Sequence, residues 1–219
     1  SYYIGILPEF KKRFIGIRYQ YKGLKTHIGP NGNISYLSTD ETYQAIDLWG
    51  AWNIGKKFRV MGFIPYNINQ RTNTAGTSSK SGVGDIALNG YYQLFNKQNT
   101  LNGKKLLVHS LWLGGGIKLP SGKYNPADKN SAQGSQNSFQ LGTGSIDGMV
   151  NAMYDLRIQD IGMNLNASYK FNTANKYDYR YGNKITLNWL AYYKIRATKK
   201  FLIAPNAGCL WESSANDKN

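Results

Sequence analysis

Histidine, cysteine and carboxylate side chains are the usual carriers of catalysis and metal binding, and this chain has few of them in useful spacing. His27 and His109 are the only histidines, and neither stands in an H-x-H or E-x-x-H arrangement. Cys209 is the single cysteine, which excludes an intrachain disulfide and a cysteine-built metal cluster. No nucleophile stands beside a base in a hydrolase pattern. We therefore expect no enzymatic activity, no metal site and no cofactor.

Asp85 and Asp147 are the two carboxylates with a distinctive setting, because each follows a glycine-rich stretch and begins a polar run. One interpretation is a carboxylate pair at the mouth of a channel, where it meets a solute or a cation. The other is that both carboxylates pair with nearby Lys or Arg and accept hydrogen bonds from loop amides. We favour the second, since a narrow interior must neutralise its charges.

A period of two recurs along the chain and predicts strands. Between Ile146 and Ile158, apolar residues take every second position and polar residues take most of the others, as a strand with one apolar face requires. About ten such strands are predicted, near 2–10, 13–23, 42–54, 59–69, 84–95, 106–119, 145–158, 161–172, 184–196 and 201–212. Many exceed the usual length of about 5–6 residues and match the roughly 9–11 that cross a bilayer at a tilt.

The predicted connections alternate between short and long. Tight turns are expected at 11–12, 55–58, 159–160 and 198–200, with a somewhat longer connection at 96–105. Long loops rich in Gly, Ser, Asn, Thr and Lys are expected at 24–41, 70–82, 120–144 and 173–183. Outer-membrane barrels have this asymmetry. The sequence thus predicts one domain, 1–219, that is all-β: an antiparallel up-and-down transmembrane β-barrel.

The two faces of the strands are then assigned by composition. A soluble barrel would turn the apolar set inward, and alternation alone does not decide between the two senses. Charges of both signs on the polar set and Trp and Tyr near strand ends favour an apolar face towards lipid. The candidate residues of the lumen and its mouth are Arg18, Asp47, Arg59, Asp85, Lys118, Asp147, Asp155, Arg157, Lys170, Lys194 and Arg196.

The ends of the chain carry an expectation about strand number. By the alternation of turns and loops, Ser1 and Asn219 would both lie on the long-loop side, whereas bacterial barrels usually have both termini in the periplasm. We therefore expect a further strand at each end and about 12 strands in the full protein, an even number as single-chain barrels require.

The net charge of +15 makes nucleic acid an obvious partner to consider. The basic residues are spread over turns and strands, and no zinc-finger or RRM motif is present. We rank nucleic-acid binding last and expect no nucleic-acid partner. A mean hydropathy of −0.49 excludes a bundle of membrane helices, and no run of about 18 apolar residues occurs.

Three segments carry a recognisable series of motifs: Gly82–Leu88 with G-x-G-D, Gly116–Tyr124 with G-x-x-L-P-S-G, and Gly142–Asp147 with G-T-G-S-x-D. In this order they resemble the phenol-degradation MetA-pathway-like family of outer-membrane β-barrels, often described as transporters. The segments Tyr3–Phe10 and Ile15–Tyr19 look like the Bacteroidetes branch of that family. The resemblance implies the outer membrane of a Gram-negative bacterium and movement of small, hydrophobic compounds.

The leading functional hypothesis is a passive channel or transporter for small solutes, with outer-membrane lipid as its surroundings. With Lys22 and Lys184, the interior set holds nine basic residues against four aspartates, so an open path should disfavour cations. The alternative is a non-conducting accessory subunit that binds other outer-membrane proteins. The longest loop, Pro120–Gly144, is the candidate gate or an unstructured surface loop. Its candidate gating residues are Lys123, Tyr124, Asp128 and Lys129.

Overall fold

The computed structural model describes residues 13–28, 34–73, 76–101, 105–126, 139–196 and 202–218, and these residues form strands, turns and loops without an α-helix. The strands are β1 (Arg13–Ile28), β2 (Ile34–Ile54), β3 (Phe58–Asn73), β4 (Gly76–Val83), β5 (Ile86–Leu101), β6 (Lys105–Leu119), β7 (Asp147–Ile158), β8 (Ile161–Phe171), β9 (Lys184–Tyr193), β10 (Ile195–Arg196), β11 (Leu202–Ile203) and β12 (Asn206–Ser214). No helix in these ranges is long and apolar enough to span a membrane.

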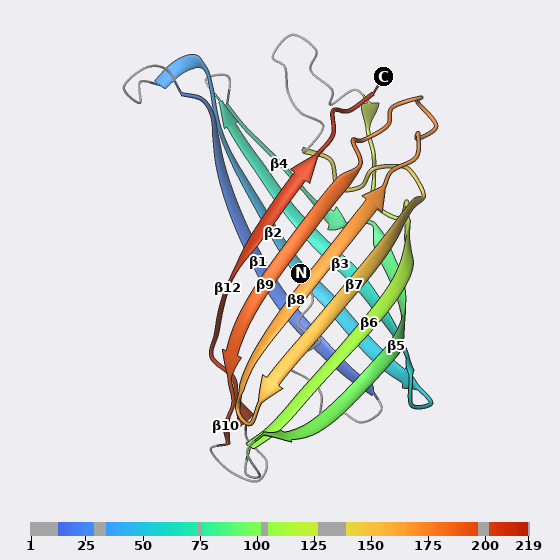
Figure 1. The fold of residues 1–219 in the computed structure, drawn as a ribbon. Helices are drawn as coiled ribbons and strands as arrows, with labels where there is room; N and C mark the ends of the chain where they lie inside the picture. Colours follow the sequence, from blue (N-terminus) through green and yellow to red (C-terminus); the bar gives the residue numbers. More distant parts are fainter. Residues whose placement is uncertain are drawn as a thin grey trace.

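Ten of the strands form one antiparallel sheet in the order β1-β2-β3-β5-β6-β7-β8-β9-β12. The tenth, β4, pairs with the far half of β3 from Tyr66 to Asn73, while β5 pairs with its near half from Phe58 to Phe63. The sheet curls into a half-barrel with β1 and β12 at its two edges (Figure 1). The prediction of an all-β, antiparallel chain that runs up and down between neighbouring strands is therefore confirmed.

Two of the predicted long loops are wrong. Most of 24–41 belongs to β1 and β2, which pair from Arg13↔Trp52 up to Ile28↔Ile34. Most of 70–82 belongs to β3 and the additional strand β4. The extension of β3 and β4 is polar on both faces, as the β4 sequence GTSSKSGV illustrates. The extension of β1 and β2 mixes apolar residues such as Leu24 and Leu37 with polar ones without a regular period, so neither extension carries an alternation to detect. Main-chain hydrogen bonding between neighbouring strands nevertheless continues beyond the apolar band.

Other predicted boundaries agree or lie outside the described residues. The 96–105 connection is shorter than expected, because β5 runs to Leu101 and β6 starts at Lys105. Tight turns occur at 55–57 and 159–160, where Gly55 and Gln159 have positive φ. The predicted strand 2–10 and the turns at 11–12 and 198–200 lie outside the described residues.

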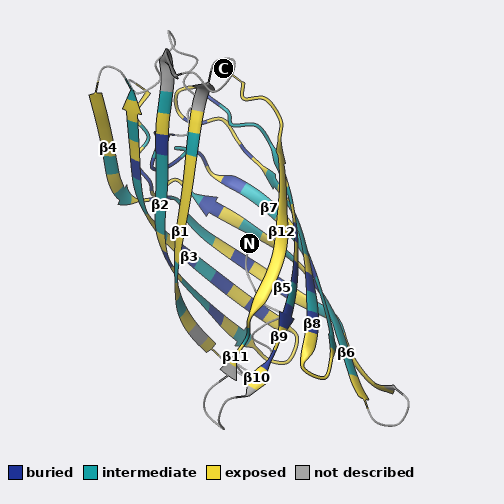
Figure 2. Cartoon of the chain, turned by 90° about the vertical axis from the view of Figure 1, so that its left-hand side faces the viewer, coloured by how far each residue is buried: buried dark blue, intermediate teal, exposed yellow. Residues whose placement is uncertain are grey.

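The sheet turns its apolar face outward. Ile15 is 82% exposed and Ile117 47%, whereas Asp147 and Asn164 on the opposite face are each 1% exposed. The alternation of exposed and buried positions follows inner strands such as β3, whereas the edge strand β12 is exposed throughout (Figure 2). Further exposed apolar residues are Ile17, Tyr19, Tyr21, Ile46, Leu48, Trp52, Val60, Ile64, Tyr66, Leu113, Leu165, Tyr169, Phe171, Ile185, Leu187, Trp189, Tyr193 and Ile195. The concave side of the half-barrel is therefore its polar side.

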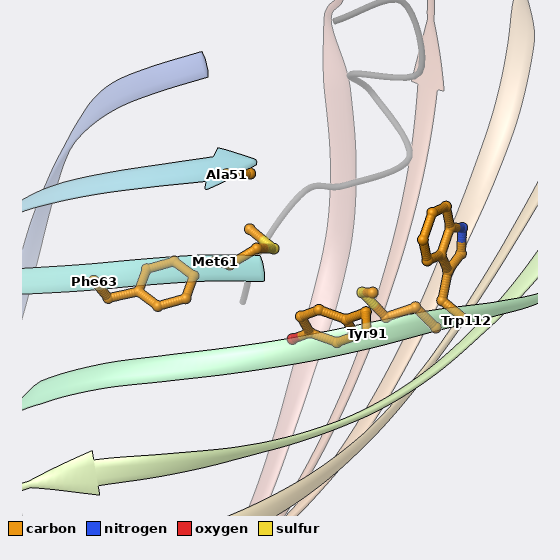
Figure 3. Packing of buried hydrophobic residues seen from close by; sticks show 6 residues of the cluster. Ala51, Met61, Phe63, Tyr91 and Trp112 are labelled. Carbon is orange, nitrogen blue, oxygen red and sulfur yellow. The ribbon is translucent and has the colours of Figure 1, made fainter. Parts of the chain in front are cut away.

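One apolar cluster interrupts this polar interior. It is formed by side chains from β2, β3, β5, β6 and β7, which meet inside the curl (Figure 3). Met61 and Met153 are 0% and 1% exposed, so the cluster is as tightly enclosed as a soluble core. Its members are Ala51, Met61, Phe63, Tyr91, Trp112 and Met153.

Close contact between β5 and β6 depends on glycine at two positions of β6, Gly114 and Gly116. A Cβ atom at Gly116 would lie 2.5 Å from the Leu88 carbonyl oxygen and 2.0 Å from Asn89 Oδ1, whereas one at Gly90 would meet no atom within 4 Å. We predict that Gly116→Ala lowers the free energy of unfolding by about 1–3 kcal/mol, because the backbone must shift. Gly90→Ala should change it by less than about 0.5 kcal/mol.

The two glycine variants would be compared by unfolding each folded protein in urea and monitoring the transition by tryptophan fluorescence. Equal midpoints for Gly116→Ala and Gly90→Ala would show that the tight approach at Gly116 does not matter for stability.

Candidate functional site

The three sequence motifs meet at one end of the polar face, around the carboxylate of Asp85. This residue lies in the two-residue connection between β4 and β5. Its Oδ1 accepts a hydrogen bond from the Gly122 amide at 3.0 Å. Its Oδ2 accepts from both the amide and the hydroxyl of Thr143, each at 2.8 Å. Asp85 thus ties β5 to both arms of the loop that joins β6 to β7.

Lys118 links this carboxylate to the second one. It stands near the end of β6, directly opposite Asp147 in the β6–β7 register. Its Nζ lies 2.6 Å from Asp85 Oδ2 and 2.6 Å from Asp147 Oδ2, and it also donates to the Thr143 hydroxyl. Lys170 on β8 approaches Asp147 Oδ2 at 3.3 Å. Two carboxylates and two ammonium groups therefore compensate one another.

Asp147 is fully enclosed, and its other oxygen is also used. Oδ1 accepts from the Ser145 hydroxyl at 2.8 Å and from the Thr173 amide at 3.1 Å. Such a buried carboxylate is tolerated only with charge partners and several hydrogen bonds. This geometry agrees with the charge-pairing interpretation of Asp85 and Asp147, in which loop amides complete the coordination of each carboxylate.

The glycines of the motifs allow close backbone contacts, and the serine hydrogen-bonds to the neighbouring backbone. A Cβ atom at Gly142 would lie 2.4 Å from Asp85 Oδ1, and one at Gly122 would lie 2.7 Å from the Gly142 Cα. The Ser121 hydroxyl donates to the Gly84 carbonyl oxygen and accepts from the Ile86 amide, each at 2.8 Å. The motifs therefore hold the start of β5, the end of β6 and the start of β7 together. We call the cluster of Asp85, Lys118 and Asp147 at this point the charged joint.

The loop between β6 and β7 folds back over the polar face. Asn67 on β3 donates to the Leu141 carbonyl oxygen at 3.1 Å, and Asn69 donates to that of Gln140 at 3.3 Å. Phe139 is 5% exposed and lies between Arg71 and Lys80, at 4.7 and 5.0 Å from its ring centre. The return arm of this loop, residues 139–146, therefore narrows the space that the sheet encloses.

The outgoing arm of the same loop, residues 120–126, contributes Tyr124 to a cluster of tyrosines. The Tyr124 ring lies 5.7 Å from that of Tyr177 and 6.5 Å from that of Tyr179, and Tyr179 packs edge-on against Tyr181 at 5.0 Å. Burial, followed by the nearby hydroxyls of Tyr124 and Tyr179, raises the pKa of Tyr181, which stays protonated at neutral pH. Lys123 is exposed and its carbonyl accepts from Gly142 at 3.2 Å. The predicted gating residues Asp128 and Lys129 lie outside the described residues.

The remaining predicted interior residues fall into separate places. Arg18 and Asp47 form a pair across β1 and β2, with Nε donating to Oδ2 at 2.9 Å. At the end of the interior away from Asp85 and Lys118, the Tyr192 hydroxyl donates to Asp155 at 3.3 Å. Lys194 lies 5.7 Å from the centre of the Tyr192 ring.

Three further predicted residues are arginines, and two of them, Arg59 and Arg157, form no salt bridge in the described part of the chain. Arg59 stacks over Trp112 at 4.8 Å, and Arg157 lies opposite Val108 in the register of β6 and β7. Arg196 pairs with Leu202 through the backbone in the short ladder of β10 and β11.

One interior ion pair escaped the sequence interpretation. Glu41 is 5% exposed and accepts from Arg71 Nε at 2.6 Å. The two residues are direct partners in the β2–β3 register. Both fall in segments predicted as loops, and their opposite charges were the one available signal. In the described ranges no group of three or more His, Cys, Asp or Glu side chains could hold a metal ion.

The enclosure of Asp147 yields a prediction for the two lysines that contact it. The Lys118 side chain is 9% exposed, and that of Lys170 is 28% exposed. We predict that Lys118→Met destabilises the fold by about 3 kcal/mol, since it leaves two buried carboxylates short of a partner. Lys170→Met should destabilise the fold clearly less, because the Lys170 ammonium group lies farther from Asp147 and is partly hydrated.

Unfolding in urea at neutral pH measures both lysine variants, and a circular-dichroism spectrum of each confirms that it is folded at the start. A loss for Lys170→Met as large as that for Lys118→Met would contradict the central position of Lys118.

Comparison with known proteins was made by sequence. No curated protein matches the chain. A family model described as "Putative MetA-pathway of phenol degradation" matches residues 23–219, which include all three motifs around Asp85, Lys118 and Asp147. Since the match covers most of the chain, this protein belongs to the MetA-pathway of phenol degradation family.

Proposed function

We propose that this chain forms the wall of an outer-membrane β-barrel, in a Gram-negative bacterium, through which small solutes pass. The observation that carries the proposal is the inverted sheet, with its apolar face exposed and its charged face turned inward. Apolar surface costs about 25 cal/mol per Å² in water, and soluble proteins rarely expose continuous patches beyond a few hundred Å². Acyl chains would cover this face without that cost.

The interior of this barrel would suit small solutes. A polar cavity of ≈ 310 Å³ lies beside the charged joint, lined by Lys118, Asn151, Lys170 and their neighbours. The apolar cluster around Met61 and the return arm at Phe139 limit the cross-section. The excess of basic residues supports a path that disfavours cations. The family description, which names phenol degradation, supports small organic compounds as the solutes.

A second candidate function is a non-conducting accessory subunit of a larger outer-membrane assembly. The apolar cluster favours it, because Met61 and Met153 are wholly enclosed within the curl. Small barrels often have a lumen that side chains fill. The two functions differ in one measurable property: only the channel supports a solute flux or an ion current through the purified full-length protein.

The outward apolar face predicts which tryptophans contact lipid. Trp52, Trp189 and Trp211 are 64%, 40% and 54% exposed, while Trp112 is 9% exposed on the inner face. In vesicles with brominated acyl chains, which quench only nearby indoles, we predict that Trp112→Phe increases the quenched fraction of the fluorescence. Trp189→Phe should decrease it.

Vesicles without bromine serve as the reference for both tryptophan variants. If Trp112→Phe instead removes most of the quenching, lipid contacts the polar face and the proposed membrane orientation is wrong.

The inward loop predicts a gating effect. Asn67→Ala combined with Asn69→Ala removes two hydrogen bonds that hold the return arm against β3. We predict a larger single-channel conductance and a weaker preference for anions in planar bilayers, since the arm is free to leave the interior. Thr72→Ala, an exposed position on the same strand, is the matched control and should behave as the wild type.

Unchanged conductance and selectivity in the folded Asn67/Asn69 variant would exclude this loop as the gate. A complete lack of current and solute flux in the wild-type protein would instead favour the accessory subunit.

A further inference from the structure

A second polar pocket lies at the other end of the interior, away from the charged joint. Its volume is ≈ 100 Å³, and its lining includes Arg59, Trp112, Asp155, Arg157 and Asn164. The register of β6, β7 and β8 brings these residues together, since Ser110 faces Asp155 and Asp155 faces Asn164. The pocket is thus built from neighbouring strands of the rigid sheet.

Arg59 is the unusual member of this pocket. It is 6% exposed, its Nε donates to Asn53 Oδ1 at 2.7 Å, and its guanidinium stacks 4.8 Å over the Trp112 ring. Within the described ranges it forms no salt bridge, whereas Lys118, another enclosed basic residue of the inner face, has two carboxylates. A buried guanidinium ordinarily needs an anion to offset its loss of hydration.

Two further residues supply donors to the same space. Arg157, which also lines the pocket, forms no salt bridge with any described residue. Asn164 is 1% exposed and adjoins Asp155, yet neither its amide nitrogen nor its amide oxygen makes a hydrogen bond of good geometry. Unsatisfied buried amides are rare, and one that lines a cavity indicates a missing polar partner.

Charge and size narrow the chemistry of that partner. Arg59 and Arg157 outnumber Asp155 in the lining, and Lys194 also acts on the Asp155 carboxylate, so the pocket has an excess of positive charge that suits an anion. The planar fork of a guanidinium matches a carboxylate through two parallel hydrogen bonds. A space of ≈ 100 Å³ is smaller than the cavity of about 150 Å³ that holds benzene. Trp112 and Met153 provide an apolar wall for a short aliphatic tail.

We propose that this pocket binds a small aliphatic carboxylate, held between Arg59 and Arg157 with the amide of Asn164 as an additional donor. The inference deepens the proposed function, because the pocket lies in the interior taken as the solute path. It gives that path a binding step for organic anions. Equilibrium binding to the purified full-length protein does not require transport, so the two proposals are tested separately.

The test is a titration of the detergent-solubilised full-length protein with sodium acetate, which replaces sodium chloride at constant ionic strength. Trp112 reports on the pocket, and Trp112→Phe should abolish the fluorescence change. We expect saturable binding that is weakened at least about tenfold by Arg59→Gln and by Arg157→Gln. Lys56→Gln, which removes the same charge from an exposed turn, should leave the affinity unchanged.

Arg157→Gln keeps the test decisive if Arg59→Gln does not fold, because Arg157 is less enclosed. The proposal is overturned if the folded wild type gives no saturable signal, if phosphate binds more tightly than acetate, or if Lys56→Gln weakens binding as much as Arg157→Gln. Ion current without acetate binding would refute this site and leave the channel function standing. Acetate binding without current would do the reverse.

Discussion

The charged joint around Lys118 is the interaction on which the rest of the described architecture depends. One ammonium group bridges Asp85 and Asp147 at 2.6 Å each and thereby links the starts of β5 and β7 to the end of β6. A polar interior leaves little apolar surface to hold these strand ends together. Enclosed ion pairs with several hydrogen bonds do so, and they impose a definite geometry because each partner is costly to leave alone.

This joint also determines the course of the loop between β6 and β7. Asp85 binds Gly122 on the outgoing arm and Thr143 on the return arm, so both arms start from the inner face. From there the return arm reaches β3, where Asn67 holds it. The mouth of the interior is therefore shaped by the same contacts that stabilise the strand ends, and mouth shape and stability are coupled.

The two ends of the interior differ in electrostatics. At the joint, opposite charges compensate one another within hydrogen-bonding distance. At the other end, Arg59 is enclosed by Trp112 and Asn53 without a carboxylate at salt-bridge distance in the described chain. The apolar cluster around Met61 adjoins this second end, since its members Trp112 and Met153 also line the pocket there. Charge compensation therefore stabilises one end, and the uncompensated positive charge at the other end is the basis of the proposed anion site.

The sequence by itself determined the strands of the apolar band and the positions of the three motifs, because a period of two and glycine-rich turns are local signals. Only the tertiary structure decided the hairpin extensions at Thr26 and Lys80, since segments without a regular apolar period give no local signal for a strand. The partners of Asp85, the Glu41–Arg71 pair and the isolation of Arg59 were likewise decided by long-range register. A charge pattern along a chain names candidates, but strand pairing across distant segments determines which charges meet.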